Sequence, residues 1–136
     1  MNERAVIVGG GRVGRHTAEQ LIEHGYSVTI VERDAEKVEA LSSRRVGTVV
    51  EGDGTDRETL REAGAAEANI VAALTDDTSA NVIVCGLARE LSPEVETLAR
   101  VAEDGEQQYQ YLSDVDSVVY PAAAGADVTV DRILRD

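Results

Sequence analysis

The sequence lacks phenylalanine and tryptophan altogether and contains only four tyrosines among its 136 residues. Proteins that bind single-stranded nucleic acid stack the bases on aromatic side chains, and this chain has little material for such a platform. Positive charge is also scarce, because 13 basic residues face 26 acidic ones and the formal net charge is -13. A surface of that sign repels phosphate polymers. The composition therefore excludes a general nucleic-acid-binding protein.

Cysteine occurs once, as Cys85, which excludes an internal disulfide and a cysteine-rich zinc site. It lies in the apolar run Val82–Cys85, so we expect a buried core residue. No apolar run approaches the roughly 18 residues that a membrane span needs, and Met1–Arg4 leads directly into a strand-like segment. We therefore expect a cytoplasmic protein that reaches a membrane only through a partner, with no metal site.

Lysine is almost absent as well, since Lys37 is the only one and every other basic residue is arginine. An acidic chain with so little lysine resembles proteins of salt-loving organisms (halophiles), whose carboxylates stay hydrated in concentrated salt. The alternative is an ordinary soluble protein with an incidentally acidic surface. In both cases the acidic groups repel one another until salt screens them.

Short runs of β-branched residues alternate with longer amphipathic stretches along the whole sequence. The pattern predicts strands at residues 5–8, 27–31, 48–50, 70–74, 95–101 and 117–120. It predicts helices at residues 12–24, 35–43, 55–64, 77–91, 107–112 and 122–134. Asp34 is a suitable N-cap for the second helix, and Thr55–Glu58 fits a capping box for the third. The spacing favours one α/β domain over residues 1–136, a Rossmann-like doubly wound parallel sheet with strand order 3-2-1-4-5-6.

A glycine-rich turn follows the first expected strand, with the spacing G-x-G-x-x-G. The glycines are Gly9, Gly11 and Gly14, and Arg12 and Val13 lie between the last two. The first glycine allows a tight turn, the second lets the backbone approach a pyrophosphate, and the third permits close packing of helix on strand. The helix start then attracts phosphate through its free N–H groups and its dipole. We expect nucleotide binding here; a purely structural turn is the alternative.

Glu32 ends the second expected strand, 18 residues after Gly14. A dinucleotide fold places there the acid that accepts hydrogen bonds from the adenosine ribose. The alternative is a solvated carboxylate at a strand end. A carboxylate at this position disfavours a 2′-phosphate, so NAD(H) or an adenine nucleotide is expected rather than NADP(H). The neighbouring Arg33 weakens that inference.

Two further loops follow strands at the same edge of the expected sheet. Asp53 and Gly54 come after the third strand, where Asp53 either accepts from an adenine amino group or caps the next helix alongside Thr55. Thr75 and Asp76 come after the fourth strand, at the switch point, and we expect them to face the second half of a ligand. Asp77 either joins them or caps the following helix.

These motifs together resemble the N-terminal nucleotide-binding domain of potassium-transport regulators, the TrkA-N, KTN or RCK family. The matching stretches are Val8–Arg15, Val31–Asp34, Gly52–Asp56, Ala73–Asp77 with Asn81, and Leu98–Val101. The resemblance implies a Rossmann cleft for NAD(H), ATP or ADP, pairing of such domains into homodimers, and a cytoplasmic regulatory subunit of a potassium transporter or channel.

The resemblance also implies a phosphate contact for Arg12, reaching the terminal phosphate of ATP where that is bound. Arg100 ends the fifth expected strand at the same sheet edge, so both guanidinium groups could converge on one cleft. Many members carry a C-terminal sensing lobe, and this sequence ends before one could form. Some place an acid just after the sixth-strand proline, whereas Ala122 follows Pro121 here. That puts a divalent ion between nucleotide phosphates in doubt.

Two other classes of protein remain as alternatives. A small NAD-dependent oxidoreductase needs a catalytic group and usually a substrate domain, but Tyr-x-x-x-Lys cannot exist around Lys37 and few residues follow the sixth strand. The intact glycine loop with Glu32 argues against an interaction module whose cleft has lost its ligand. We therefore expect a regulatory protein and not an enzyme.

The acid excess generates a prediction about salt. The melting temperature should rise substantially between dilute buffer and molar KCl, because salt screens the repulsion among the carboxylates. Thermal unfolding followed by circular dichroism measures this. A flat profile would leave the charge as an incidental surface property.

Overall fold

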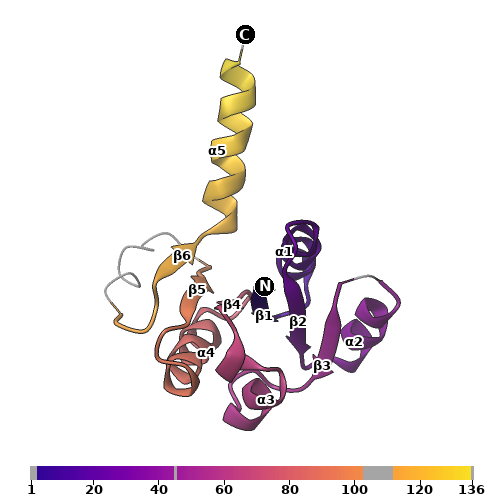
Figure 1. Ribbon diagram of the computed structural model, residues 1–136. Coiled ribbons are helices and arrows are strands. Elements are labelled where there is room, and N and C mark those ends of the chain that lie inside the picture. Colours follow the sequence, from indigo (N-terminus) through magenta and orange to yellow (C-terminus); the bar gives the residue numbers. More distant parts are fainter. Residues whose placement is uncertain (1–2, 45, 103–111, 136) are drawn as a thin grey trace.

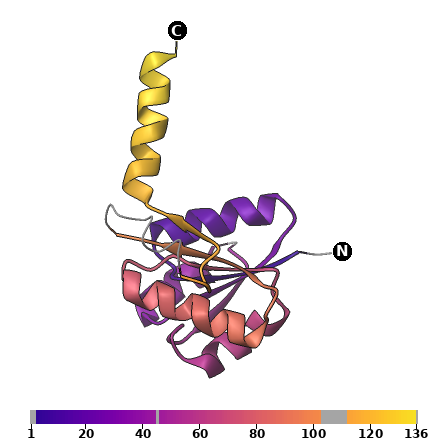
Figure 2. The same cartoon turned by 90° about the vertical axis from the view of Figure 1, so that its left-hand side faces the viewer.

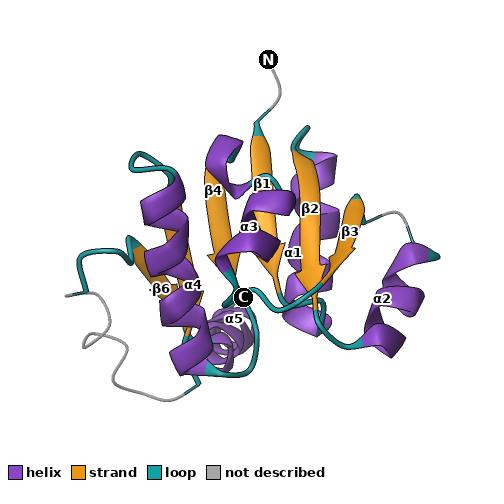
Figure 3. Ribbon diagram, turned by 90° about the horizontal axis from the view of Figure 1, so that it is seen from below, coloured by secondary structure: helices purple, strands orange, loops and turns teal. Residues whose placement is uncertain are grey.

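Six parallel strands form a single twisted sheet in the computed structural model, which describes residues 3–44, 46–102 and 112–135. The strands are β1 (Arg4–Val8), β2 (Ser27–Glu32), β3 (Thr48–Glu51), β4 (Ile70–Ala73), β5 (Glu96–Arg100) and β6 (Ser117–Val119). Their order is β3-β2-β1-β4-β5-β6, and every neighbouring pair is parallel. Figure 3 shows β3, β2, β1 and β4 side by side. The predicted Rossmann-like sheet and its strand order are confirmed.

The helices connect and flank these strands. They are α1 (Arg12–Glu23), α2 (Ala35–Ser42), α3 (Arg57–Glu62), the 3₁₀ turn η1 (Ala65–Glu67), α4 (Thr78–Leu91) and α5 (Pro121–Leu134). Aspartate caps three of them: Asp34, Asp56 and Asp77 accept from the backbone N–H of Glu36, Glu58 and Ala80. The capping role expected for Asp34 is confirmed, and Asp77 takes the capping role that was one of its two alternatives. Each cap satisfies a backbone donor that the helix leaves unpaired.

The start of α3 corrects the expected capping box. The N-cap is Asp56 and not Thr55, whose hydroxyl donates to Asp53 Oδ1 at 2.7 Å instead. Because the Thr55 hydroxyl is already bonded to Asp53, Asp56 caps the helix in its place, one residue further on. The helix expected at residues 107–112 falls almost wholly outside the described residues.

The two faces of the sheet bury separate clusters of apolar side chains. In Figure 1, α1 lies on one side of the sheet and α3 and α4 lie on the other. Ile7 of β1 packs on the α1 face together with Leu41 of α2, whereas its neighbours Val6 and Val8 pack on the opposite face with Leu60 of α3. Alternate residues of one strand thus serve opposite faces, as the pleat dictates. Both faces of the central strands are covered, which explains their continuous apolar runs.

Helix α5 departs from the body of the domain. It projects away from the sheet, and Figures 1 and 2 show this from two directions. None of its 14 residues is buried. Val128, Val130, Ile133 and Leu134 are all more than half exposed, with Leu134 at 76%. Among the described helices, none combines the length and the apolar character that crossing a membrane requires.

Candidate functional site

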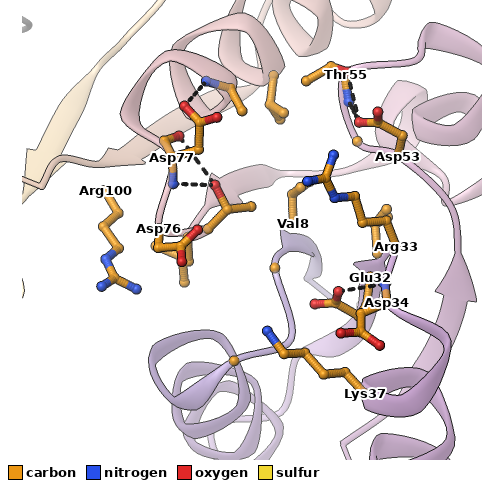
Figure 4. A pocket seen from close by; sticks show the side chains of 18 of the residues that line it. Val8, Glu32, Arg33, Asp34, Lys37, Asp53, Thr55, Asp76, Asp77 and Arg100 are labelled. Atoms are coloured by element: carbon orange, nitrogen blue, oxygen red, sulfur yellow. Dashed lines mark hydrogen bonds between the residues drawn. The ribbon is translucent and has the colours of Figure 1, made fainter.

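A cleft of about 870 Å³ opens at the carboxyl ends of the central strands (Figure 4). This is the switch point, where the chain winds from β1 toward β2 on one side and toward β4 on the other. The predicted site residues that line it are Gly9, Gly11, Arg12, Val13, Glu32, Arg33, Asp53, Gly54, Thr75, Asp76 and Arg100. Gly14 is the exception among the predicted set.

The first and third glycines of the loop are required by packing. Gly9 has φ +108°, and its N–H donates to Val31 O at 2.8 Å, which holds the loop against β2. A Cβ on Gly14 would lie 1.8 Å from the Gly9 carbonyl oxygen. Such a contact is impossible without moving the loop, so Gly14 lets α1 lie against the turn that precedes it.

Gly11 differs from its neighbours because no described residue occupies the space beside it. A Cβ there would meet no heavy atom within 4 Å. Gly11 is also the N-cap of α1, and no side chain accepts a hydrogen bond at this helix start. The first turn holds no acidic residue either, whereas aspartates cap α2, α3 and α4. Helix α1 therefore begins at the cleft with N–H groups and a positive dipole end that no described side chain caps.

Glu32 fastens the glycine loop to the end of β2. Its carboxylate accepts from Gly10 N at 2.7 Å and from Asp34 N at 2.8 Å, one bond on each oxygen. The residue is only 7% exposed, so these charge-assisted bonds compensate a nearly buried charge. The carboxylate has lone pairs left for further donors. The sequence predicts the acid at this position but gives no sign that it also holds the backbone of both loops.

Asp53 does not cap α3, the structural role that the sequence offers as one of two alternatives, because Asp56 is the N-cap. It holds the turn before the helix instead. Its Oδ1 accepts from the backbone N–H of Thr55 at 2.9 Å as well as from the hydroxyl of the same residue. These two bonds lower the pKa of the Asp53 carboxyl, and the nearby positive charge of Arg33 adds to the effect. Gly54 packs directly on β1, since a Cβ there would lie 2.4 Å from Val8 Cγ1. Asp53 therefore lines the cleft as an ionised, oriented carboxylate.

Asn81 joins the two strand ends on the other side of the cleft. Its side chain is fully buried; Oδ1 accepts from the Thr75 hydroxyl at 2.6 Å, and Nδ2 donates to Arg100 O at 2.9 Å. The loop after β4 is thus tied to the end of β5. Arg100 lines the cleft, and its buried Nε has no hydrogen-bond partner among the described residues. The sequence points to Asn81 only through the family resemblance.

Several residues that line the cleft are absent from the predicted set. Lys37 reaches it from α2, and Ser79, Ala80 and Ile83 line it from the first turns of α4. The sequence patterns select residues that directly follow a strand, and these four lie within helices. Lys37 does stand out in the sequence as the only lysine. Cys85 lies outside the cleft, fully buried as expected, and burial raises the pKa of its thiol to about 11.

The sequence is similar to that of known proteins. The family model of the TrkA-N domain matches residues 5–121. The Trk system potassium uptake protein TrkA homolog of Pyrococcus horikoshii is 32% identical over 131 residues, which cover 96% of this chain and 58% of that protein. The chain thus spans little more than half the length of this relative.

Solved structures share the fold. The TrkA-N domain of the inner membrane protein ybaL from Escherichia coli superposes with a TM-score of 0.84 at 23% identity, over 99% of this chain and 98% of that one. The GsuK channel bound to NAD gives a TM-score of 0.75 at 21% identity, over 88% of this chain and 21% of that one. GsuK has also been solved bound to ADP. The family match over most of the sequence, with the Pyrococcus relative, shows that the chain belongs to the TrkA-N family.

Proposed function

We propose that the cleft binds an adenine nucleotide, NAD(H) in the first place and ATP or ADP as alternatives. The observation that carries this proposal is the uncapped start of α1 beside the open space at Gly11. A pyrophosphate there would accept from the free N–H groups and gain from the helix dipole. Glu32 would accept from the ribose hydroxyls, and Asp53 from the adenine amino group. The NAD and ADP complexes of GsuK, which has the same fold, support this choice.

The nucleotide is proposed to regulate potassium transport. The Pyrococcus relative is named a Trk system potassium uptake protein, which supports a transporter or channel in the membrane as the partner. This domain would work on the cytoplasmic side, held at the membrane by that partner. Nucleotides can signal only if they bind two conformations of the domain with different affinity. The loop that Asn81 ties to β5 offers a mechanical link from the ligand toward β6 and α5.

A regulatory role suits the cleft better than a catalytic one. The described residues that line it include neither histidine nor cysteine, the commonest groups for proton transfer and nucleophilic attack near neutral pH. The pKa of Asp53 is lowered, which makes that carboxyl a poor general acid. We therefore assign its side chains to binding.

Substitutions at two glycines of the loop should distinguish an effect on binding from an effect on folding. Gly11→Val should abolish binding of NADH and ADP while leaving the circular dichroism spectrum and melting temperature close to those of the original protein, because the valine fills only the ligand's space. Gly14→Val is the matched control and should unfold the protein, since its Cβ meets the Gly9 carbonyl. Calorimetric titration gives the affinity. Unchanged affinity in the Gly11 variant would place the ligand elsewhere.

The arginine at the helix start should report on phosphate. Arg12→Ala should weaken nucleotide binding by about 1.5–3 kcal/mol, the scale of a hydrogen bond to a charged group, and more for ATP than for NAD(H). Glu32→Ala should weaken every ligand that carries an adenosine ribose. Titration of both variants with NADH, ADP and ATP distinguishes the roles. Equal, small losses for Arg12→Ala across the three ligands would mean that this arginine contacts no phosphate.

We further propose that the chain forms a homodimer through α5. Val130, Ile133 and Leu134 lie at spacings of three and four, so they share one face of a helix that nothing in the described chain covers. An exposed apolar stripe on a projecting helix is typical of a protein–protein contact.

The oligomeric state tests this. Ile133→Glu should shift the protein toward monomer in light scattering coupled to size exclusion, because it places a charge in the apolar stripe. Arg132→Glu adds a glutamate at the adjacent position, on the other face, and should leave the dimer intact. Equal behaviour of the two variants would contradict a contact through this face.

A further inference from the structure

A network of polar groups lies at the amino ends of β5 and β6, at the opposite end of the strands from the cleft. Asp116, directly before β6, accepts with Oδ2 from Arg89 Nη2 of α4 at 2.8 Å and from Thr97 N of β5 at 2.9 Å. The Thr97 hydroxyl donates to Asp114 O at 2.6 Å and accepts from Asp116 N at 3.0 Å. We refer to Arg89, Thr97, Asp114 and Asp116 as the amino-end cluster.

Burial makes the bonds of this cluster important to its members. Thr97 is fully buried, and the buried Nε of Arg89 has no hydrogen-bond partner among the described residues. A guanidinium group taken out of water needs a strong acceptor, and the Asp116 carboxylate supplies one. Burial raises the pKa of the Asp116 carboxyl, but the hydrogen bonds from Thr97 and Arg89 outweigh burial and leave that pKa lowered. The ionised carboxylate therefore joins α4 and β5 to the start of β6.

Strand β6 has few other attachments. It is three residues long, lies at the edge of the sheet and pairs with β5 alone among the described strands (Figure 1). All three of its residues are only half-buried, and α5 follows without one buried residue. Near the carboxyl end of the strand, Val101 N donates to Val119 O at 2.9 Å. A segment with so few buried contacts opens at a lower free energy than a central strand.

We propose that the amino-end cluster holds β6 and α5 to the domain as one unit, the C-terminal arm, which opens without unfolding the rest of the sheet. Opening moves α5 together with its apolar stripe. Glu32 and the glycine loop keep their contacts, because β4 and β5 lie between β6 and the strands that carry them. The cluster thus sets how often α5 leaves its place on this chain, whether or not a nucleotide is bound.

Hydrogen exchange of backbone amides, followed by nuclear magnetic resonance in the native state, tests this. The Val101 amide reports on the attachment of β6, and the Leu74 amide, which donates to Val8 O at 2.7 Å, reports on the central sheet. Val101 should be less protected than Leu74. Asp116→Asn should lower the protection factor of Val101 at least about tenfold, the scale of a hydrogen bond to a charged group, and leave that of Leu74 nearly unchanged.

Two further variants connect the effect to the cluster. Asp131→Asn is the matched control, because it removes a carboxylate that pairs with Arg135 within α5, and it should leave Val101 protected. Arg89→Met should reproduce the selective loss, and the double variant should lose little more, since both changes remove the same contact. Unchanged protection of Val101 would overturn the proposal. An equal loss at Val101 and Leu74, or an unfolded Asp116 variant, would also overturn it, because the arm would then not open separately.

Discussion

The carboxylate of Glu32 holds together the two loops on which the cleft depends. It accepts the N–H of Gly10 from the glycine loop and the N–H of Asp34 from the β2–α2 loop. Hydrogen bonds to a charged group contribute about 1.5–3 kcal/mol each, and both donors would be left unsatisfied without the carboxylate. The arrangement also leaves little room at position 10, where a Cβ would lie 3.2 Å from Glu32 Oε1 and 2.4 Å from Leu41 Cδ1. One side chain thus sets the position of both the glycine loop and the β2–α2 loop.

Three of the acidic residues stabilise helix starts. Aspartates close the N-termini of α2, α3 and α4, so those helix dipoles are compensated from within the chain. Helix α1 has no such cap and begins instead with Gly11 and Arg12. Helix α1 thus brings an uncapped, positive helix end to a cleft that Arg12, Arg33, Lys37 and Arg100 also line.

Much of the fold could be predicted from the sequence because its signals are local. Apolar runs predict the strands, the glycine spacing predicts the turn after β1, and Glu32 is recognised by its place at a strand end. Each of these signals depends only on residues close together in the sequence. The strand order follows from handedness and crossover rules. The N-cap of α3 was predicted wrongly at Thr55, since the turn around Asp53 competes for the same side chain and no pattern ranks the two.

Other features depend on contacts between distant parts of the chain. Asn81 bonds to Thr75 and to Arg100, 19 residues away, and nothing in the local sequence encodes that pairing. Lys37 lines the cleft because α2 begins beside the glycine loop. That placement depends on how α2 packs on the sheet and not on the residues next to Lys37. Helix α5 was predicted correctly as a helix, but its amphipathic pattern does not say whether its apolar side packs on this chain or on another surface.

Binding at the start of α1 is tested most directly by nuclear magnetic resonance of the backbone amides during titration with NADH. The amide signals of Gly10, Gly11 and Val13 should shift, with Asp34 and Thr75, because a pyrophosphate would take up the free N–H groups and the ribose would lie against Glu32. Gly64, which lies outside the cleft, should not move. Shifts confined to residues outside the glycine loop, or no shifts at saturating NADH, would contradict nucleotide binding at this helix.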